Sequence, residues 1–250
     1  MTPKLSIIIP NYNEKENLQA GALTQVHNYL KGVDFTWEVI ISDDGSTDGS
    51  RDLAEEFASK HSGFRLQKNI HGGKASAINA GIKNAKGEII LFTDMDQSTP
   101  LKEVEKLLPF YDQGYDVVFG SRGKARKNFP LSRQVTSWGF RTFRQIFLLS
   151  HVVDTQCGFK SFRAEVAKKI FPKLSAVSGN KKVVGWTVSA FDVELLFLAE
   201  KAGYKLMEVD VEWSQQDIST GKGNKMVKES VDMLKQVLTV KLNDLKGLYN

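Results

Sequence analysis

The 250-residue sequence lacks the residues and motifs that are diagnostic of several protein classes. It contains one cysteine, Cys157, so an internal disulfide is impossible, as is typical of proteins from reducing compartments. Its four histidines are scattered, and the absence of CxxC and HExxH motifs argues against zinc. No apolar stretch approaches the roughly 20 residues of a membrane-spanning helix. The first apolar run is short and ends at Pro10, unlike a signal peptide. We therefore expect a protein that is soluble or peripheral to a membrane, with no transmembrane segment.

The charge and composition of the chain narrow its partners and its domain organisation. A net charge of +5 and a pI near 9.1 suit an anionic ligand or a lipid surface. This bias is too weak to indicate nucleic acid without a localised basic patch. With 41% hydrophobic and 25% charged residues, the chain can bury a sizeable core. Because no repeat or linker interrupts it, we expect one domain over residues 1–250.

Apolar runs alternate with amphipathic segments along the first half of the chain. This alternation predicts an α/β fold with a mainly parallel sheet flanked by helices. The expected strands cover residues 4–10, 37–44, 64–69, 87–94, 115–121, 154–163 and 204–213. The expected helices cover residues 15–30, 48–61, 74–85, 101–114, 131–153, 191–203 and 225–245. In the last helix, Val227, Val231, Leu234 and Leu238 form the expected apolar stripe.

Polar residues follow the predicted strands, and ligands bind beyond the carboxyl ends of such strands. The segment "DDGSTDGS" from Asp43 is typical of a turn with a helix cap, although paired acids there also suit a base or ribose. The segment "DMD" places Asp94 and Asp96 where they can share a hard cation such as Mg²⁺ or Mn²⁺. It equally suits a helix N-terminus before Pro100. Neither GxGxxG after a strand nor GxxxxGK[ST] occurs, so the dinucleotide and P-loop interpretations lose their main support.

The motifs together resemble family 2 glycosyltransferases, which have the Rossmann-like GT-A fold. The similarity is carried by "SIIIPNYNEKENL", "EVIISDDGSTDGS", "GGKASAINAGIKNAKGEIILFTDMD" and "GSR". The segments "DTQCGFK" and "FDVELLFLA" are similar to dolichyl-phosphate glucosyltransferases, within the wider group of polyprenyl-phosphate sugar synthases. The resemblance is dense over the first half of the chain and patchy as far as Trp213.

The resemblance implies a role for individual residues. The nucleotide would be held by Pro10, Tyr12, Glu14, Asp43, Asp44, Lys74 and Asp94. Asp94 and Asp96 match the metal and diphosphate motif, whereas a metal role for Gln97 is doubtful because the mannose enzymes carry Gln one place later. The acceptor phosphate would be cradled by Arg122, Arg133 and Ser137, with both arginines also counted as catalytic. These roles divide the chain into a donor half, about 1–120, and an acceptor and membrane-facing half, about 121–250.

The second half also contains candidates whose patterns have two interpretations. The sugar pocket would be formed by Asp154, Gln156, Trp186 and Asp192. Trp186 also suits a protein core, and Asp192 also suits a helix N-cap. Lys222 and Lys225 lie in a Gly-rich stretch that would close over the diphosphate or serve as a solvated linker. The basic and aromatic segment 131–153 suits a membrane interface, or equally a core helix with arginines on its wet face.

The expected activity is an inverting, metal-dependent transfer of a hexose from a nucleotide sugar to a polyprenyl or dolichyl phosphate. UDP-glucose is the favoured donor and GDP-mannose the alternative, and a glycan acceptor is a further alternative. The enzyme would act at the cytoplasmic face of a membrane. Two rival classes are a sugar-1-phosphate nucleotidyltransferase, whose Gly-rich N-terminal signature is missing here, and a non-enzymatic nucleotide-sugar-binding subunit of a membrane complex.

Overall fold

The computed structural model describes residues 2–123, 148–149, 151–178, 191–214 and 226–249, and in the last range side chains for residues 235 and 237–249. Seven strands of these residues form one sheet in the order β3-β2-β1-β4-β6-β5-β7. The strands are β1 (Leu5–Asn11), β2 (Trp37–Asp43), β3 (Phe64–Lys68), β4 (Ile89–Phe92), β5 (Val117–Ser121), β6 (Lys160–Arg163) and β7 (Leu206–Asp210).

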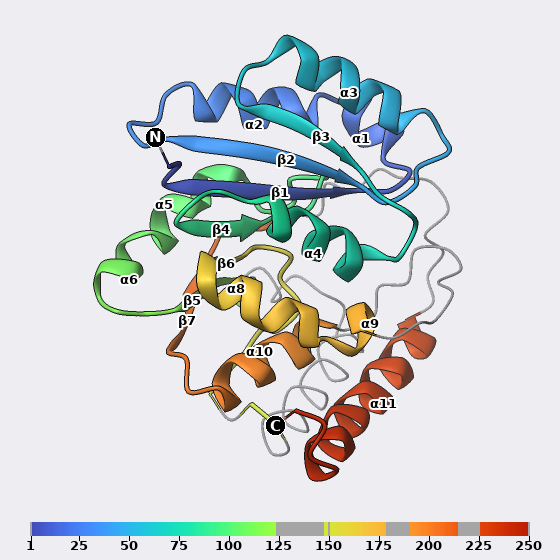
Figure 1. Ribbon diagram of the computed structural model, residues 1–250, viewed down its shortest axis with the longest axis vertical. Helices are drawn as coiled ribbons and strands as arrows, with labels where there is room; N and C mark the ends of the chain where they lie inside the picture. The colour runs from blue at the N-terminus through green and yellow to red at the C-terminus, as the bar shows by residue number, and fades with distance from the viewer. Residues whose placement is uncertain (1, 124–147, 150, 179–190, 215–225, 250) are drawn as a thin grey trace.

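Strand direction decides where the ends of the strands meet. Strands β3, β2, β1 and β4 are parallel to their neighbours, and β5 and β7 are parallel to each other. Strand β6 is antiparallel to both β4 and β5, so β5 runs in the same direction as β4. The carboxyl ends of six strands therefore lie at one edge of the sheet (Figure 1). The predicted mainly parallel, mixed sheet is confirmed.

Helices cover both faces of the sheet (Figure 1). They are α1 (Lys15–Gln19), α2 (Ala22–Leu30), α3 (Ser50–Lys60), α4 (Lys74–Asn84), η1 (Leu101–Glu103), α5 (Val104–Leu107), α6 (Pro109–Asp112), α8 (Ala164–Ile170), η3 (Phe171–Lys173), α9 (Ser175–Ser178), α10 (Phe191–Lys201) and α11 (Met226–Leu245). Since side chains alternate along a strand, Ile8 of β1 packs with α4, α8 and α10, whereas Ile7 and Ile9 pack with α2, η1 and α5. This two-sided burial explains why β1 is apolar almost throughout.

Several predicted elements are divided or shortened. The predicted helix 15–30 is two helices, because Gly21 adopts a left-handed conformation with φ 89° between α1 and α2. The predicted helix 101–114 is divided into η1, α5 and α6, with Pro109 at the first position of α6. Of the predicted strand 154–163, only residues 160–163 pair, and the short helices between Ala164 and Ser178 were not predicted.

Two predictions on the second half are wrong in part. Most of segment 131–153 lies outside the described residues, but its described end is turn and coil, with Leu149 and Val152 buried in the core. The predicted final helix is confirmed as α11, yet Leu238 is 47% exposed, and Val237 and Val240 are buried instead. No helix in the described ranges combines the length and the apolarity needed to cross a bilayer.

Candidate active site

The ends of β1 and β2 bring the first predicted nucleotide residues together. Pro10 is buried in β1, opposite Ser42 of β2. Just past the strand, the Tyr12 ring stacks on the His71 ring with centroids 4.4 Å apart. Glu14 is buried and accepts a hydrogen bond of 2.6 Å from the Asn17 side chain. A planar aromatic surface therefore lies at the strand end where the nucleotide base was expected.

Asp44 holds the loop that precedes α4. Its buried carboxylate accepts hydrogen bonds from the backbone of Gly72 at 2.9 Å and of Gly73 at 2.8 Å, and lies 2.9 Å from His71 Nδ1. Burial raises the pKa of Asp44, and this outweighs the lowering by the two backbone donors and His71. Nε2 of His71 is buried and has no hydrogen-bond partner in the described part of the chain. His71 was missed by the sequence analysis, although its place just before the double glycine was a usable signal.

Asp43 is saturated by its neighbours. Its carboxylate accepts from Asn11 Nδ2 at 2.8 Å, from Arg51 Nε at 2.7 Å and from the backbone of Gly45 and Ser46 at 3.2 and 3.3 Å. Two of these four donors, at Gly45 and Ser46, lie in the turn that follows β2. The turn and the functional interpretation of "DDGSTDGS" are thus compatible, because Asp43 shapes the turn that presents Asp44.

Asp94 and Lys74 meet beyond the end of β4. The Lys74 ammonium group forms an ion pair with Asp94 Oδ1, and the Lys74 side chain is 12% exposed against 36% for Asp94. Burial alone would lower the pKa of Lys74, but the charges of Asp94, Asp192 and Asp96 raise it overall. Charged side chains from three segments therefore act on the Lys74 ammonium group.

Glycine at position 158 lets the chain approach Asp94 closely. A Cβ atom at Gly158 would lie 2.0 Å from Asp94 Oδ2, which no side chain can tolerate. Asp96 accepts a hydrogen bond of 2.9 Å from the Ser98 backbone, and Gln97 is buried with φ 51° and donates from Nε2 to the Asp94 carbonyl. The "DMD" segment is thus a tight turn that fixes both carboxylates, and η1 begins only at Leu101.

A buried lysine lies behind this cluster. Lys160 of β6 is fully buried, and its ammonium donates to Asp192 Oδ1 at 2.7 Å and to the Cys157 carbonyl. Asp192 lies in the first turn of α10, so its carboxylate faces Lys160 rather than a backbone cap. Lys160 was also missed, because nothing in "CGFKSFR" distinguishes a buried lysine from an exposed one.

Arg122 and Asp154, which the sequence assigned to different ligands, contact each other. The Arg122 guanidinium donates from Nε to Oδ2 at 2.7 Å and from Nη2 to Oδ1 at 2.9 Å of Asp154. Burial lowers the pKa of Arg122, but its bonds to Asp154 raise it overall. The guanidinium also lies 5.7 Å from the Trp213 ring centroid, and the Gln156 backbone donates to Asp154 at 3.0 Å. The predicted residues Arg133, Ser137, Trp186, Lys222 and Lys225 lie outside the described residues.

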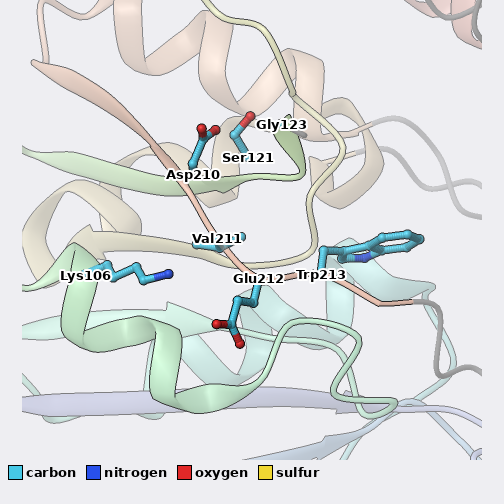
Figure 2. Close-up of a pocket in the computed structure, with 7 residues that line it drawn as sticks. All are labelled: Lys106, Ser121, Gly123, Asp210, Val211, Glu212 and Trp213. Atoms are coloured by element: carbon cyan, nitrogen blue, oxygen red, sulfur yellow. The ribbon is translucent and has the colours of Figure 1, made fainter. Parts of the chain in front are cut away.

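A pocket of about 410 Å³ opens beside Trp213 at the ends of β5 and β7. Figure 2 shows Asp210 and Ser121 at one end of it, and Lys106 and Glu212 at the other. Gly123 leaves space for Asp210, since a Cβ there would lie 2.5 Å from Asp210 Oδ1. Carboxylates beside an aromatic ring suit a polyhydroxylated ligand. The pocket adjoins the Arg122–Asp154 pair through Trp213.

Comparison with known proteins identifies the family. The family model for glycosyl transferase family 2 matches residues 6–171. The chain belongs to glycosyltransferase family 2. A dolichyl-phosphate beta-glucosyltransferase of Trichomonas vaginalis is 34% identical over 246 residues, which cover 92% of this chain and 72% of the relative. The human dolichyl-phosphate beta-glucosyltransferase is 31% identical over 270 residues, covering 99% of this chain and 78% of the relative. The protein is therefore a glycosyltransferase, as predicted.

Solved structures show the same fold at low sequence identity. Glucosyl-3-phosphoglycerate synthase of Mycobacterium tuberculosis, solved with Mn²⁺ and UDP, superposes with a TM-score of 0.62 at 18% identity, covering 96% of this chain and 79% of that one. A mannosyltransferase of Pyrobaculum calidifontis, solved with GDP-mannose and Mn²⁺, gives 0.62 at 18% identity, covering 96% and 65%. The fold of this glycosyltransferase is GT-A.

The residues present fit a divalent cation shared with a ligand. Within the described residues, no group of three or more His, Cys, Asp or Glu is arranged to hold a metal alone. Asp94 and Asp96 nevertheless offer hard carboxylate oxygens, and Asp94 already balances the charge of Lys74. Mg²⁺ and Mn²⁺ sites in which one or two carboxylates are completed by phosphate oxygens have this donor set.

Proposed function

We propose that this glycosyltransferase transfers glucose from UDP-glucose to the phosphate of a polyprenyl phosphate. The observation that carries the proposal is the similarity over more than nine-tenths of the chain to dolichyl-phosphate beta-glucosyltransferases. The geometry supports it, since acids, a lysine and an aromatic stack converge at the strand ends where a sugar nucleotide would lie. The site of action would be the cytoplasmic face of a membrane, where a lipid phosphate is accessible to a peripheral enzyme.

On the donor side, the Tyr12 and His71 rings would contact the base, and the unpartnered His71 Nε2 would meet a polar group of the nucleotide. Asp94 and Asp96 would hold Mg²⁺ or Mn²⁺, which supplies Lewis-acid stabilisation of the leaving diphosphate when bound. Lys74 would add a second positive charge beside the same oxygens. Pro10, Glu14, Asp43 and Asp44 would shape this pocket, with Asp44 fixing the loop before α4.

On the acceptor side, the phosphate oxygen already carries negative charge near neutral pH and attacks the anomeric carbon directly. The bond from that carbon to the donor phosphate breaks, UDP leaves, and one displacement inverts the configuration to a β-linked lipid-phosphate sugar. No protein nucleophile is needed. Arg122, Arg133 and Ser137 would orient the acceptor phosphate, Asp154, Gln156, Trp186 and Asp192 would surround the sugar, and Lys222 and Lys225 would approach the diphosphate.

The test is a donor screen with purified protein, radiolabelled UDP-glucose or GDP-mannose, and a polyprenyl phosphate. We expect label from UDP-glucose to enter the organic phase, and excess EDTA to stop the transfer. Asp96→Asn should lower turnover at least about 10²-fold, because a main electrostatic stabiliser of the leaving group is lost. Asp112→Asn, an exposed acid in α6, is the matched control and should leave turnover unchanged.

Each outcome of this screen decides between alternatives. Transfer from GDP-mannose alone would reassign the donor, and transfer only to a glycan would reassign the acceptor. Full activity in EDTA would refute the metal role of Asp94 and Asp96. Donor binding without any turnover would favour a nucleotide-sugar-binding subunit over an enzyme that acts alone.

A further inference from the structure

Helix α11 is held against the protein by one face. Val237 and Val240 are 0% and 2% exposed and belong to the core that α10 shares. Lys201 of α10 forms an ion pair of 2.5 Å with Asp244. Past the helix, the Tyr249 hydroxyl donates to the buried Glu194 carboxylate at 2.7 Å. These contacts fix the rotation of α11, so its opposite face is defined by the fold.

That opposite face is apolar and exposed. Leu238, Leu242, Leu245 and Leu248 are 47%, 53%, 73% and 66% exposed. They are four of the six large apolar side chains that are exposed in the described part of the chain. Leu238, Leu242 and Leu245 lie on one side of α11 at spacings of four and three residues, and Leu248 lies three residues past the end of the helix. We call these four residues the leucine face. Figure 1 shows α11 at the periphery of the molecule beside α10.

Lysines lie along both borders of the leucine face. At 3.6 residues per turn, Lys235 and Lys241 lie about 60° from Leu238 in opposite directions, and Lys246 is the first residue past the end of α11. Lys241 is 3.7 Å from Asp244, whose other ion pair is with Lys201. An apolar stripe bordered by lysines is the pattern of helices that lie in a membrane interface, where long cationic side chains reach the headgroups.

We propose that the leucine face binds the surface of an anionic lipid bilayer. The charges of the chain argue against the other occupants. Segment 124–147 carries six Lys and Arg and no acid, segment 179–190 two lysines and no acid, and segment 215–225 two lysines and one acid, so each is net positive and none complements a lysine-bordered face. A second copy of this chain would bring its own lysines against these lysines. An apolar partner with negative charge at its surface satisfies both parts of the pattern.

The inference rests on the proposed function in one respect only: an enzyme with a polyprenyl acceptor must reach a membrane. It also moves part of the expected membrane contact from segment 131–153 to α11. Leu149 and Val152, at the end of the segment first assigned to the interface, are buried in the core, whereas the leucine face lies about 90 residues further along the chain.

The experiment is flotation of the full chain with vesicles of phosphatidylcholine alone or with one-third phosphatidylglycerol. We expect the wild type to float with the anionic vesicles and less in high salt. Leu242→Ser with Leu245→Ser should lower the partition coefficient at least about tenfold, because the inserted apolar groups are lost. Lys235→Glu with Lys246→Glu should lower it at least about tenfold on anionic vesicles only. Ile70→Ser, an exposed apolar residue far along the chain, is the matched control and should float like the wild type.

Because the substituted side chains are exposed, thermal unfolding should match that of the wild type and show that the variants are folded. Wild-type flotation without loss in the leucine variant overturns the proposal. A second result would also overturn it: the wild type does not float, and size exclusion shows a dimer that the leucine variant dissociates. The leucine face would then be covered by a second copy of the chain. Transfer to a short, water-soluble prenyl phosphate separates this proposal from the enzymatic one. If that transfer fails while flotation responds as expected, the function is wrong and the membrane surface stands.

Discussion

Two aspartates, Asp43 at the end of β2 and Asp154 in the loop before β6, are each fully buried and each accept a 2.7 Å hydrogen bond from the Nε atom of an arginine. They differ in how many residues along the chain separate each aspartate from its arginine. Arg51 lies eight residues from Asp43, whereas Arg122 lies 32 residues from Asp154. Asp43 also accepts from the turn that follows it, at Gly45 and Ser46. The arginine partner of Asp43 is therefore local and that of Asp154 comes from a distant segment, although Asp43 also accepts from Asn11, 32 residues away.

This difference also appears in the exposure and number of the arginine contacts. The Arg51 side chain is 34% exposed and makes one described bond to Asp43, whereas Arg122 is 18% exposed and makes two bonds in a fork. A forked pair of planar groups fixes both orientation and distance. We infer that losing one arginine should be nearly tolerated in the donor half and severe in the acceptor half.

The largest effect that would test this comparison is expected for Arg122→Ala. Removing the guanidinium takes the forked pair away from the Asp154 carboxylate, which is 1% exposed and keeps the backbone donors of residues 122 and 156. Breaking a buried pair by removing one partner costs about 3–5 kcal/mol of the free energy of unfolding. Urea denaturation measures this loss. Asp154→Asn combined with Arg122→Ala should recover part of it, because the buried negative charge is then gone.

Because Arg122 is also proposed to bind the acceptor phosphate, Arg122→Ala can change acceptor use as well as stability. A loss below about 1 kcal/mol, the value of an exposed pair, would show that the Arg122–Asp154 contact contributes little. If acceptor use were then lost at unchanged stability, the guanidinium would serve the acceptor phosphate first and Asp154 second. Asp154 would then depend on its arginine no more strongly than Asp43 does.

The difference between local and distant contacts explains which features could be predicted from the sequence. The sheet, its strand ends and the acids at the end of β2 were predictable, because alternating periodicity and local turn chemistry report them within windows of about ten residues. Asp43 with Gly45 and Ser46 is such a window. The burial of Asp44 and its bond to the loop of Gly72 explain why an acid occurs there, and its role beside the base stays a prediction.

What escaped prediction depends on distant contacts. The pairing of Lys160 with Asp192 spans 32 residues and lies inside the core, where local sequence gives no sign of a charge. The antiparallel insertion of β6 between β4 and β5 could not be read from periodicity, because strand direction is decided by the connections. The exposed leucines of α11 were assigned to the wrong face at Leu238, since an apolar stripe does not say whether protein or another partner covers it.

A smaller effect, on activity, is expected where the two halves touch. In Gly158→Ala, the new Cβ would lie 2.0 Å from Asp94 Oδ2, so the carboxylate or the 157–158 turn must move. A displacement of about 1 Å at a reacting group costs on the order of 10²-fold in rate. We expect kcat/KM for UDP-glucose to fall by about this factor, with thermal stability lowered only slightly.

The matched control is Gly32→Ala. Its Cβ would have an ordinary contact, 3.6 Å from the Tyr29 carbonyl, and Gly32 is remote from the strand ends. This variant should keep wild-type kinetics. Unchanged kcat/KM in Gly158→Ala would show that Asp94 can relocate without penalty, and hence that the acceptor half does not position the donor carboxylate.

The smallest effect is expected for Arg51→Ala, the donor-side counterpart of Arg122→Ala. Asp43 keeps its 2.8 Å bond from Asn11 and its two backbone donors, so its charge stays hydrogen-bonded after the arginine is lost. The removed bond joins a partly exposed donor to an acceptor with other partners, and such a bond contributes about 1 kcal/mol. Urea denaturation should therefore show a loss several-fold smaller than in Arg122→Ala, and calorimetric UDP-glucose affinity should be nearly unchanged. If the two arginine variants lost equal stability, chain separation and burial would not be what distinguishes the two halves, because the turn after β2 would depend on Arg51 as strongly as the acceptor side depends on Arg122.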